Sequence, residues 1–168
     1  DHLLLQHDAL RLHFSKNDNA WQQVHTDSNS DANDVFSRIV LSGRDDEEIA
    51  AIELHAAELQ ASLKLSNGPL VRVTLFESDK QGLCRLLIVI HHLVVDGVSW
   101  RILLDDLQSA YKQVSQGTVI NLQPKTTSFK QWTEMIADYV SSSALEPELE
   151  YWLAKPRFQI GQLPRDFA

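Results

Sequence analysis

The sequence predicts an α+β fold in which a mixed β-sheet is covered by helices. Strand-like and helix-like segments intermix along the 168 residues without a strict strand–helix–strand alternation. The continuous apolar run from Leu86 to Ile90 is typical of a strand that is covered on both sides. Between Asp45 and Lys64, apolar residues recur three and four positions apart, which indicates an amphipathic helix.

The composition disfavours several classes of function. The chain has 15 basic and 23 acidic residues, a formal charge of −8, whereas binding to a nucleic-acid backbone needs clustered Lys and Arg. Its apolar runs are far shorter than the ~20 residues of a membrane helix, and the residues after Asp1 do not resemble a signal peptide. The single cysteine, Cys84, excludes an internal disulfide and a multi-cysteine zinc site. We therefore expect a cytoplasmic protein that binds neither nucleic acid nor membrane.

The first forty residues predict a helix end followed by three strands. Leu3 to Leu5 close the helix, and a turn follows near His7 to Ala9. In the first strand Leu10, Leu12 and Phe14 alternate with polar residues, the pattern of a strand with one buried face. Next come a turn at Asn17 to Asn19, a return strand from Trp21 to His25, a polar loop from Ser28 to Asp34 and a strand from Val35 to Leu41.

The central segment predicts one helix and two neighbouring strands. In the helix from Asp45 to Lys64, the apolar stripe consists of Ile49, Ile52, Ala56, Leu59 and Leu63. The acidic run from Asp45 to Glu48 is interpreted as its solvated start, where negative charge is favourable. After the break at Asn67 to Pro69, strands are expected from Leu70 to Phe76 and from Leu83 to His91. The second of them is expected near the middle of the sheet.

The remaining chain predicts three helices. One spans Ser99 to Ser115 and ends at Gly117. Ser128 and Gln131 have the spacing of a capping box that opens the next helix. The last helix spans Glu146 to Leu153, with Pro147 at an early position.

The stretch from His91 to Trp100 carries the candidate chemistry, because it links a buried strand to a helix. Adjacent histidines at a strand end point to opposite faces, so they are a poor metal-chelating pair, and one of them can be directed into a cleft. Asp96 follows His92 by four residues, Gly97 permits a tight turn or the close approach of a ligand, and Ser99 can cap the helix. An imidazole can transfer protons near neutral pH. A core histidine hydrogen-bonded to a turn aspartate fits the spacing equally well.

Other candidate residues have plainer interpretations. We expect Cys84 to be inert within a buried strand. We expect solvent-facing side chains at His7, His13, His25 and His55. The four tryptophans, Trp21, Trp100, Trp132 and Trp152, are expected in the core or at subdomain contacts.

Three segments, in order, resemble motifs of the condensation superfamily of nonribosomal peptide synthetases. The stretch His91-His92-Leu93-Val94-Val95-Asp96-Gly97 resembles its His-His-x-x-x-Asp-Gly motif. Gly97-Val98-Ser99-Trp100 looks most like the epimerization branch, since ordinary condensation domains more often place Trp before the Ser. Gln6 to Phe14 resembles an earlier motif, with Gln6 where His or Arg is commoner, and Glu150-Tyr151-Trp152 matches a later one.

The resemblance implies a role for each residue of the motif. His92 would face the tunnel between two lobes and transfer the proton at the α-carbon of an aminoacyl or peptidyl thioester, while His91 supports the strand from its far side. Asp96 would be structural, paired with a basic side chain, and Gly97 would leave room for the phosphopantetheine arm of a peptidyl carrier protein. Ser99 and Trp100 complete the supporting motif. No cofactor would bind the chain directly.

The resemblance also implies that residues 1–168 are one lobe of a larger, chloramphenicol-acetyltransferase-like domain. A complete family domain is more than twice this length, and its Pro-Ile-Gln-like opening motif and its Glu-Gly-His-Gly-Arg-Glu-like motif are absent. We therefore expect an N-terminal lobe, truncated at both ends, that needs the C-terminal lobe and is inactive alone. A condensation domain, a non-catalytic carrier-docking module and an acyltransferase that uses coenzyme A remain alternatives.

Overall fold

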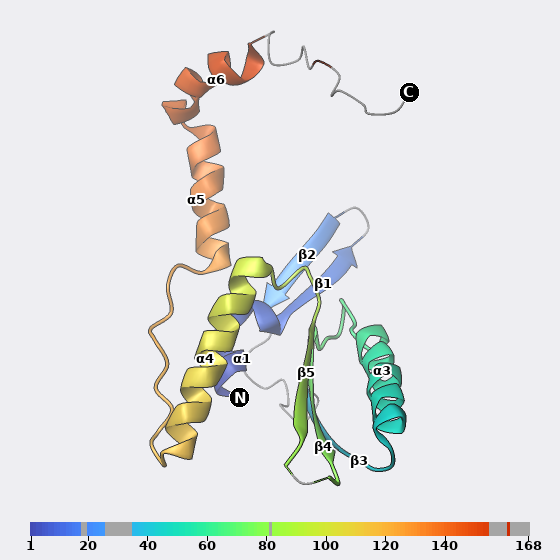
Figure 1. Cartoon of the computed structure of the whole chain (residues 1–168). Helices are drawn as coiled ribbons and strands as arrows, with labels where there is room; N and C mark the ends of the chain where they lie inside the picture. Colours follow the sequence, from blue (N-terminus) through green and yellow to red (C-terminus); the bar gives the residue numbers. More distant parts are fainter. Residues whose placement is uncertain (18–19, 26–34, 81, 155–160, 162–168) are drawn as a thin grey trace. The chain divides into compact units, whose positions relative to one another are not determined.

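The computed structural model describes residues 1–17, 20–25, 35–80, 82–154 and 161, and the chain forms two compact units, Asp1–Pro124 and Lys125–Ala168. The elements of the first unit are α1 (His2–Gln6), a 3-10 turn (Asp8–Arg11), β1 (Leu12–Asn17), β2 (Ala20–His25), β3 (Phe36–Leu41), α3 (Asp45–Ala61), β4 (Val71–Ser78), β5 (Cys84–Ile90) and α4 (Gly97–Ser115) (Figure 1). Those of the second are α5 (Phe129–Ser141), a 3-10 turn (Ser143–Leu145) and α6 (Glu146–Leu153). The predicted helices and strands are confirmed, with small shifts at their ends. The loop predicted at Ser28 to Asp34 and most of the turn at Asn17 to Asn19 lie outside the described residues.

The sheet of the first unit is mixed, as predicted. β3 and β4 run parallel and are connected through α3, because a parallel pair needs a crossover, whereas β4 and β5 form an antiparallel pair. β1 and β2 form a separate antiparallel hairpin. The expectation that β5 lies near the middle of the sheet was wrong, because β4 takes that place and β5 is an edge of the three described strands. A continuous apolar run indicates that both faces of a strand are covered, and does not tell how many strands flank it.

Helices cover the two faces of this sheet (Figure 1). On one face, Val71 belongs to a buried cluster with Leu103 of α4 and with Leu10 and Leu12, and the half-buried Leu3 and Leu4 of α1 pack against it. A cavity of about 280 Å³ with largely apolar lining lies between this face, α1 and α4. On the other face, Thr74 and Phe76 are 0% and 1% exposed, and the His55 ring of α3 meets Phe76 edge-on at 5.8 Å.

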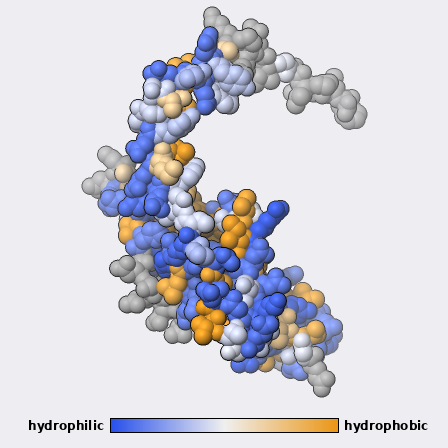
Figure 2. Space-filling view, turned by 90° about the vertical axis from the view of Figure 1, so that its left-hand side faces the viewer, coloured by the Kyte–Doolittle hydropathy of each residue, from blue (hydrophilic) through white to orange (hydrophobic). Residues whose placement is uncertain are grey.

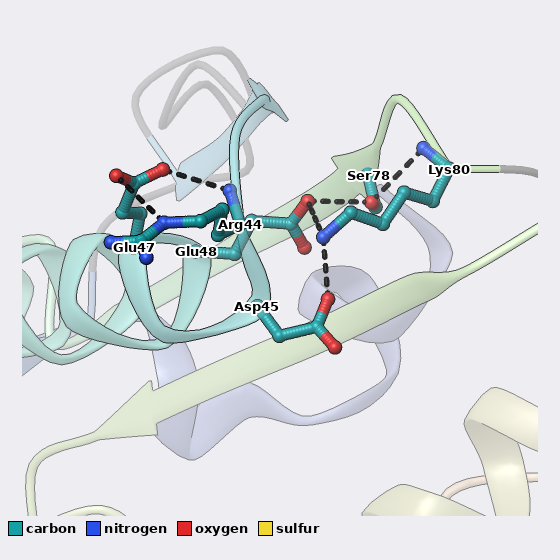
Figure 3. Close-up of polar contacts among 6 residues, drawn as sticks. All are labelled: Arg44, Asp45, Glu47, Glu48, Ser78 and Lys80. Carbon is teal, nitrogen blue, oxygen red and sulfur yellow. Dashed lines mark hydrogen bonds and ion pairs between the residues drawn. The ribbon is translucent and has the colours of Figure 1, made fainter.

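A polar network connects the first turn of α3 to the end of β4 (Figure 3). Glu48 is only 3% exposed; it accepts a hydrogen bond of 2.8 Å from Ser78 Oγ and lies 3.3 Å from Lys80 Nζ. The Lys80 ammonium also pairs with Asp45 at 2.5 Å, and this hydrogen bond lowers the pKa of Asp45 and raises the pKa of Lys80. The acidic run is therefore not a wholly solvated helix start, because Lys80 provides a partner for a buried carboxylate.

This buried carboxylate also shifts the face of α3 that packs on the sheet. Ile49, predicted in the apolar stripe, is 49% exposed, whereas Ile52, Ala56 and Leu59 are half-buried as the periodicity predicted. The packed face begins with Glu48 in place of Ile49. A sequence pattern that counts only apolar residues misses this, since a paired glutamate can occupy an inward position.

Several other environments differ from those predicted. Cys84 is exposed, because the first three residues of β5 extend into solvent. Three of the tryptophans, Trp21, Trp132 and Trp152, are 61%, 51% and 59% exposed, and Trp100 alone of the four packs against the buried cluster. The face shown in Figure 2 has further hydrophobic side chains scattered among hydrophilic ones.

The scattered histidines are also less exposed than expected, with one exception. His25 is exposed, as predicted. His7, His13 and His55 are half-buried, because His7 pairs with Asp106, His13 lies against Gly68, and His55 contacts Phe76. An added Cβ at Gly68 would come within 2.6 Å of the His13 ring, and its φ of 63° also favours glycine.

The second unit begins with the predicted capping box. Ser128 Oγ accepts from the Gln131 backbone N–H at 3.2 Å, and Gln131 Oε1 accepts from the Ser128 N–H at 3.3 Å. Glu148 of α6 accepts from the Tyr139 hydroxyl at 3.2 Å and, through its other oxygen, from Trp152 Nε1 at 3.1 Å. The negative charge of Glu148 raises the pKa of Tyr139. No helix in the described ranges of either unit is long and apolar enough to cross a membrane.

Candidate active site

The two motif histidines lie where β5 ends and the chain turns toward α4. The His91 N–H donates to the Leu70 carbonyl at 2.9 Å, and the Val94 N–H donates back to the His91 carbonyl at 3.0 Å. Val94 and Val95 are 7% and 8% exposed, so the turn is anchored in the core by two apolar side chains.

The rings of His91 and His92 have different surroundings. His91 is half-buried, and its Nδ1 accepts the Leu93 N–H at 3.2 Å, which places the proton of a neutral ring on Nε2. His92 is exposed. His91 is therefore held by its own turn, and His92 presents an imidazole at the surface of this unit.

Asp96 is the N-cap of α4. Its Oδ1 accepts the N–H groups of Ser99 at 2.7 Å and of Val98 at 3.0 Å, and also the Ser99 hydroxyl at 2.7 Å. The hydrogen bonds from Ser99 are the main reason why the pKa of Asp96 is lowered, and the nearby charge of His92 adds a smaller effect. Ser99 was predicted as the cap, but it is the third residue of the helix, and its hydroxyl supports the capping aspartate.

The Asp96 carboxylate is thus held by its own helix. Among the described residues, no Lys or Arg lies within 4.0 Å of it, so the basic partner implied by the family resemblance is not seen in this part of the chain. The open alternative of a core histidine bonded to a turn aspartate does not describe the geometry either, because Asp96 bonds to Val98 and Ser99. Asp96 positions the start of α4.

Gly97 is the first residue of α4 and has no backbone need for glycine. Its φ is not positive, and an added Cβ would meet no heavy atom within 4 Å. The interpretation as a tight turn is therefore wrong, and the close approach of another molecule remains as a reason for glycine here. Trp100, one turn further along, packs against the buried cluster and fixes the first turn of the helix to the core.

The segment from Gln6 to Phe14 is linked to the same helix. His7 Nε2 lies 3.0 Å from Asp106 Oδ2 on α4, and both side chains are about four-fifths buried. Arg11 donates to the Leu4 and Leu5 carbonyls and pairs with Asp8 at 2.8 Å. Sequence reasoning missed Asp106, although an acidic residue three positions after the inward-facing Leu103 was a signal for it.

Gln6, which departs from the family pattern, also has a structural partner. Its side-chain Nε2 donates to the Gln123 carbonyl at 2.7 Å. Gln113 holds the same returning segment, because its amide group bonds to both the N–H and the carbonyl of Asn121, at 2.6 and 3.1 Å. The chain after α4 is thereby fastened beside the two motifs.

Chemically, this arrangement offers one exposed imidazole beside a helix start that has no side chain at its first position. The described residues contain no group of three His, Cys, Asp or Glu side chains arranged to hold a metal ion. The exposed Cys84, at the opposite end of β5, is not part of the site. The site is suited to proton transfer by His92.

Comparison with known proteins agrees with this arrangement. The family model described as the condensation domain matches residues 1–168. The chain belongs to the condensation-domain family. A protein of the linear gramicidin synthase of Brevibacillus parabrevis is 41% identical over 169 residues, which cover 99% of this chain and 2% of that protein. A protein of the surfactin synthase of Bacillus subtilis is 38% identical over 165 residues, 98% of this chain and 4% of that protein.

Solved structures establish the fold of this condensation-family chain. The epimerization domain from the third module of tyrocidine synthetase B superposes with a TM-score of 0.83 at 36% identity, over 99% of this chain and 37% of that one. The starter condensation domain of rhizomide synthetase superposes with a TM-score of 0.71 at 22% identity, over 97% of this chain and 38% of that one. The chain is thus the N-terminal lobe of a chloramphenicol-acetyltransferase-like fold, and it spans a small fraction of the curated synthases and under two-fifths of these two structures.

Proposed function

We propose that this chain is the lobe of an epimerization domain that carries His92, and that the complete domain interconverts L- and D-aminoacyl or peptidyl thioesters on a carrier protein. The observation that carries the proposal is the exposed imidazole of His92 at the end of β5, next to the open first residue of α4. The likeness to the tyrocidine synthetase epimerization domain, at 36% identity, supports this branch of the family.

In the proposed reaction His92 acts as a base at the α-carbon. Its neutral imidazole accepts the α-proton, and the electron pair of the broken C–H bond moves into the thioester carbonyl. The proton must return to the opposite face of the α-carbon to invert it. The acid for that step would come from the C-terminal lobe, so this chain would be inactive alone.

The neighbouring residues would position His92 and admit the substrate. Asp96 keeps its charge through the hydrogen bonds from Val98 and Ser99, and a nearby negative charge favours the imidazolium that forms when His92 takes the proton. Gly97 leaves space in which the phosphopantetheine arm of the carrier protein could pass. The carrier protein and the C-terminal lobe are the partners that this function requires.

A condensation domain is the second candidate. The matching family model is that of the condensation domain, and a starter condensation domain shares the fold. In that reaction His92 would assist the attack of an amine on the thioester, and the product would be an amide.

Solvent deuterium wash-in on the complete domain, with an aminoacyl-loaded carrier protein, separates these functions. We expect deuterium at the α-carbon, and we expect His92→Ala to slow its incorporation at least a hundredfold, the lower end of the usual contribution of general acid–base catalysis, about 10²–10⁴-fold. His25→Ala is the matched control, because His25 is an exposed histidine on β2. An amide product without α-deuterium would instead support condensation. Unchanged turnover in His92→Ala would remove His92 from either mechanism, and no turnover in the wild-type domain would favour a docking module.

A further inference from the structure

The first two turns of α4 expose apolar side chains that the core does not use. Val98 is 67% exposed and Ile102 is 53% exposed. They are four residues apart, so they lie on one face of the helix, one turn above the other. The opposite stripe of the same helix, with Leu103 and Ala110, is buried. We call Val98 and Ile102 the α4 shelf.

The shelf begins beside the candidate catalytic group. Val98 follows Gly97, whose surroundings are open to 4 Å, and its own N–H is bonded to Asp96, the carboxylate that lies near His92. A molecule that approaches His92 past Gly97 would therefore meet the shelf next. Contiguous exposed apolar side chains beside a functional group are typical of a surface that contacts a ligand or another protein.

The polar groups around this helix start are already occupied. Asp96 Oδ1 accepts three hydrogen bonds from its own helix, and the Ser99 hydroxyl is one of the donors. The next charged side chains on this side of α4 are Arg101 and Asp105, both exposed, which flank Ile102. The surface nearest to His92 can therefore offer an apolar contact in its first turn and charge only further along.

We infer that the α4 shelf receives the substituent on the α-carbon of the carrier-bound thioester, and that the domain thereby prefers residues with apolar side chains. This inference rests on the proposed function, because it assumes that His92 acts at that α-carbon. The occupant is the substrate's own side chain, since the shelf starts at the reacting position and lacks a free hydrogen-bonding group in its first turn.

The test uses the complete domain and carrier proteins loaded with alanine, valine, phenylalanine, threonine or aspartate. In the wild-type domain we expect deuterium incorporation to be faster for valine and phenylalanine than for threonine and aspartate. The Val98→Thr variant keeps nearly the same volume and adds a hydroxyl group. It should reduce the preference for valine over threonine about tenfold, the low end of what one apolar contact contributes to selectivity.

A larger side chain at position 98 tests the same surface by its volume. Val98→Trp should slow the reaction of phenylalanine at least tenfold more than that of alanine, because it fills the space of a large substituent. Val114→Trp is the matched control: Val114 is 59% exposed in the last turns of α4, far from His92, and its variant should retain the wild-type pattern.

The outcomes separate this inference from the proposed function. If His92→Ala abolishes exchange but the position-98 variants slow all substrates equally, the shelf contacts protein and not the substituent, and the inference is overturned. A wild-type preference for threonine or aspartate would overturn it as well. If the domain forms an amide and shows no α-exchange, the same series is measured on amide formation. A substituent-dependent loss in Val98→Trp would then support the shelf and refute epimerization.

Discussion

Glu48 provides a quantitative test of how α3 is fastened to the sheet. The side chain is 3% exposed, accepts one hydrogen bond from Ser78 Oγ and contacts Lys80 Nζ. In Glu48→Ala the hydroxyl of Ser78 loses its partner, at a cost of about 1 kcal/mol, and each buried methylene removed costs about 0.8 kcal/mol. Lys80 retains Asp45 and is 37% exposed, so the loss of its second contact adds little. We expect the first turn of α3 to be destabilised by about 2 kcal/mol.

Hydrogen exchange in the complete domain measures this local effect. Amides in the first turn of α3 and at the end of β4 should exchange roughly thirtyfold faster in Glu48→Ala, since each 1.4 kcal/mol is a factor of about ten. Glu48→Gln keeps an acceptor for Ser78 and should show a smaller change. Glu53, which is exposed on the same helix, provides the matched control, and Glu53→Ala should change exchange by less than about 0.5 kcal/mol. Equal effects of Glu48→Ala and Glu53→Ala would refute the assignment of Glu48 as a buried anchor.

Two predictions concern the start of α4. Asp96→Ala should increase amide exchange at Val98 and Ser99 and reduce turnover, while Asp96→Asn, which retains an acceptor oxygen, should preserve the protection. Because the pKa of Asp96 is lowered from its ordinary 3.8, its stabilising effect is complete above that value and is lost as the pH falls through the lower folded-state pKa; loss of protection already near pH 6 would contradict this. Gly97→Ala should leave the melting temperature unchanged or raise it, because the Cβ meets no atom and alanine favours a helix by about 0.5–1 kcal/mol. Its turnover should nevertheless fall if the phosphopantetheine arm passes there, and a loss of stability would show that Gly97 has a structural role instead.

The secondary structure could be predicted because it depends on local patterns. The alternation of Leu10, Leu12 and Phe14 and the capping box at Ser128 both report interactions between near neighbours in the chain, and both are present in the structure. The site motif could be located for the same reason, since His91 to Trp100 are contiguous and their roles in the turn and the cap involve residues at most four positions apart.

Features that depend on distant residues could not be predicted in this way. Glu48 is buried because Ser78 and Lys80, thirty and thirty-two positions later, satisfy its carboxylate. His7 is largely buried because Asp106 of α4 lies 3.0 Å away. The position of β5 at an edge depends on which strands pair, which an apolar run does not encode.

The sequence by itself determined the α+β class, the order of elements and a ten-residue motif at the end of a strand, because periodicity, caps and short motifs act over a few residues. Only the tertiary structure decided which parts of that motif are free to act. It places the carboxylate of Asp96 in the cap of its own helix, leaves His92 exposed, and directs Val98 away from the core while Trp100 packs against it. These differences arise from packing between segments far apart in the chain, since the face of a helix that becomes buried is set by the sheet against which it lies.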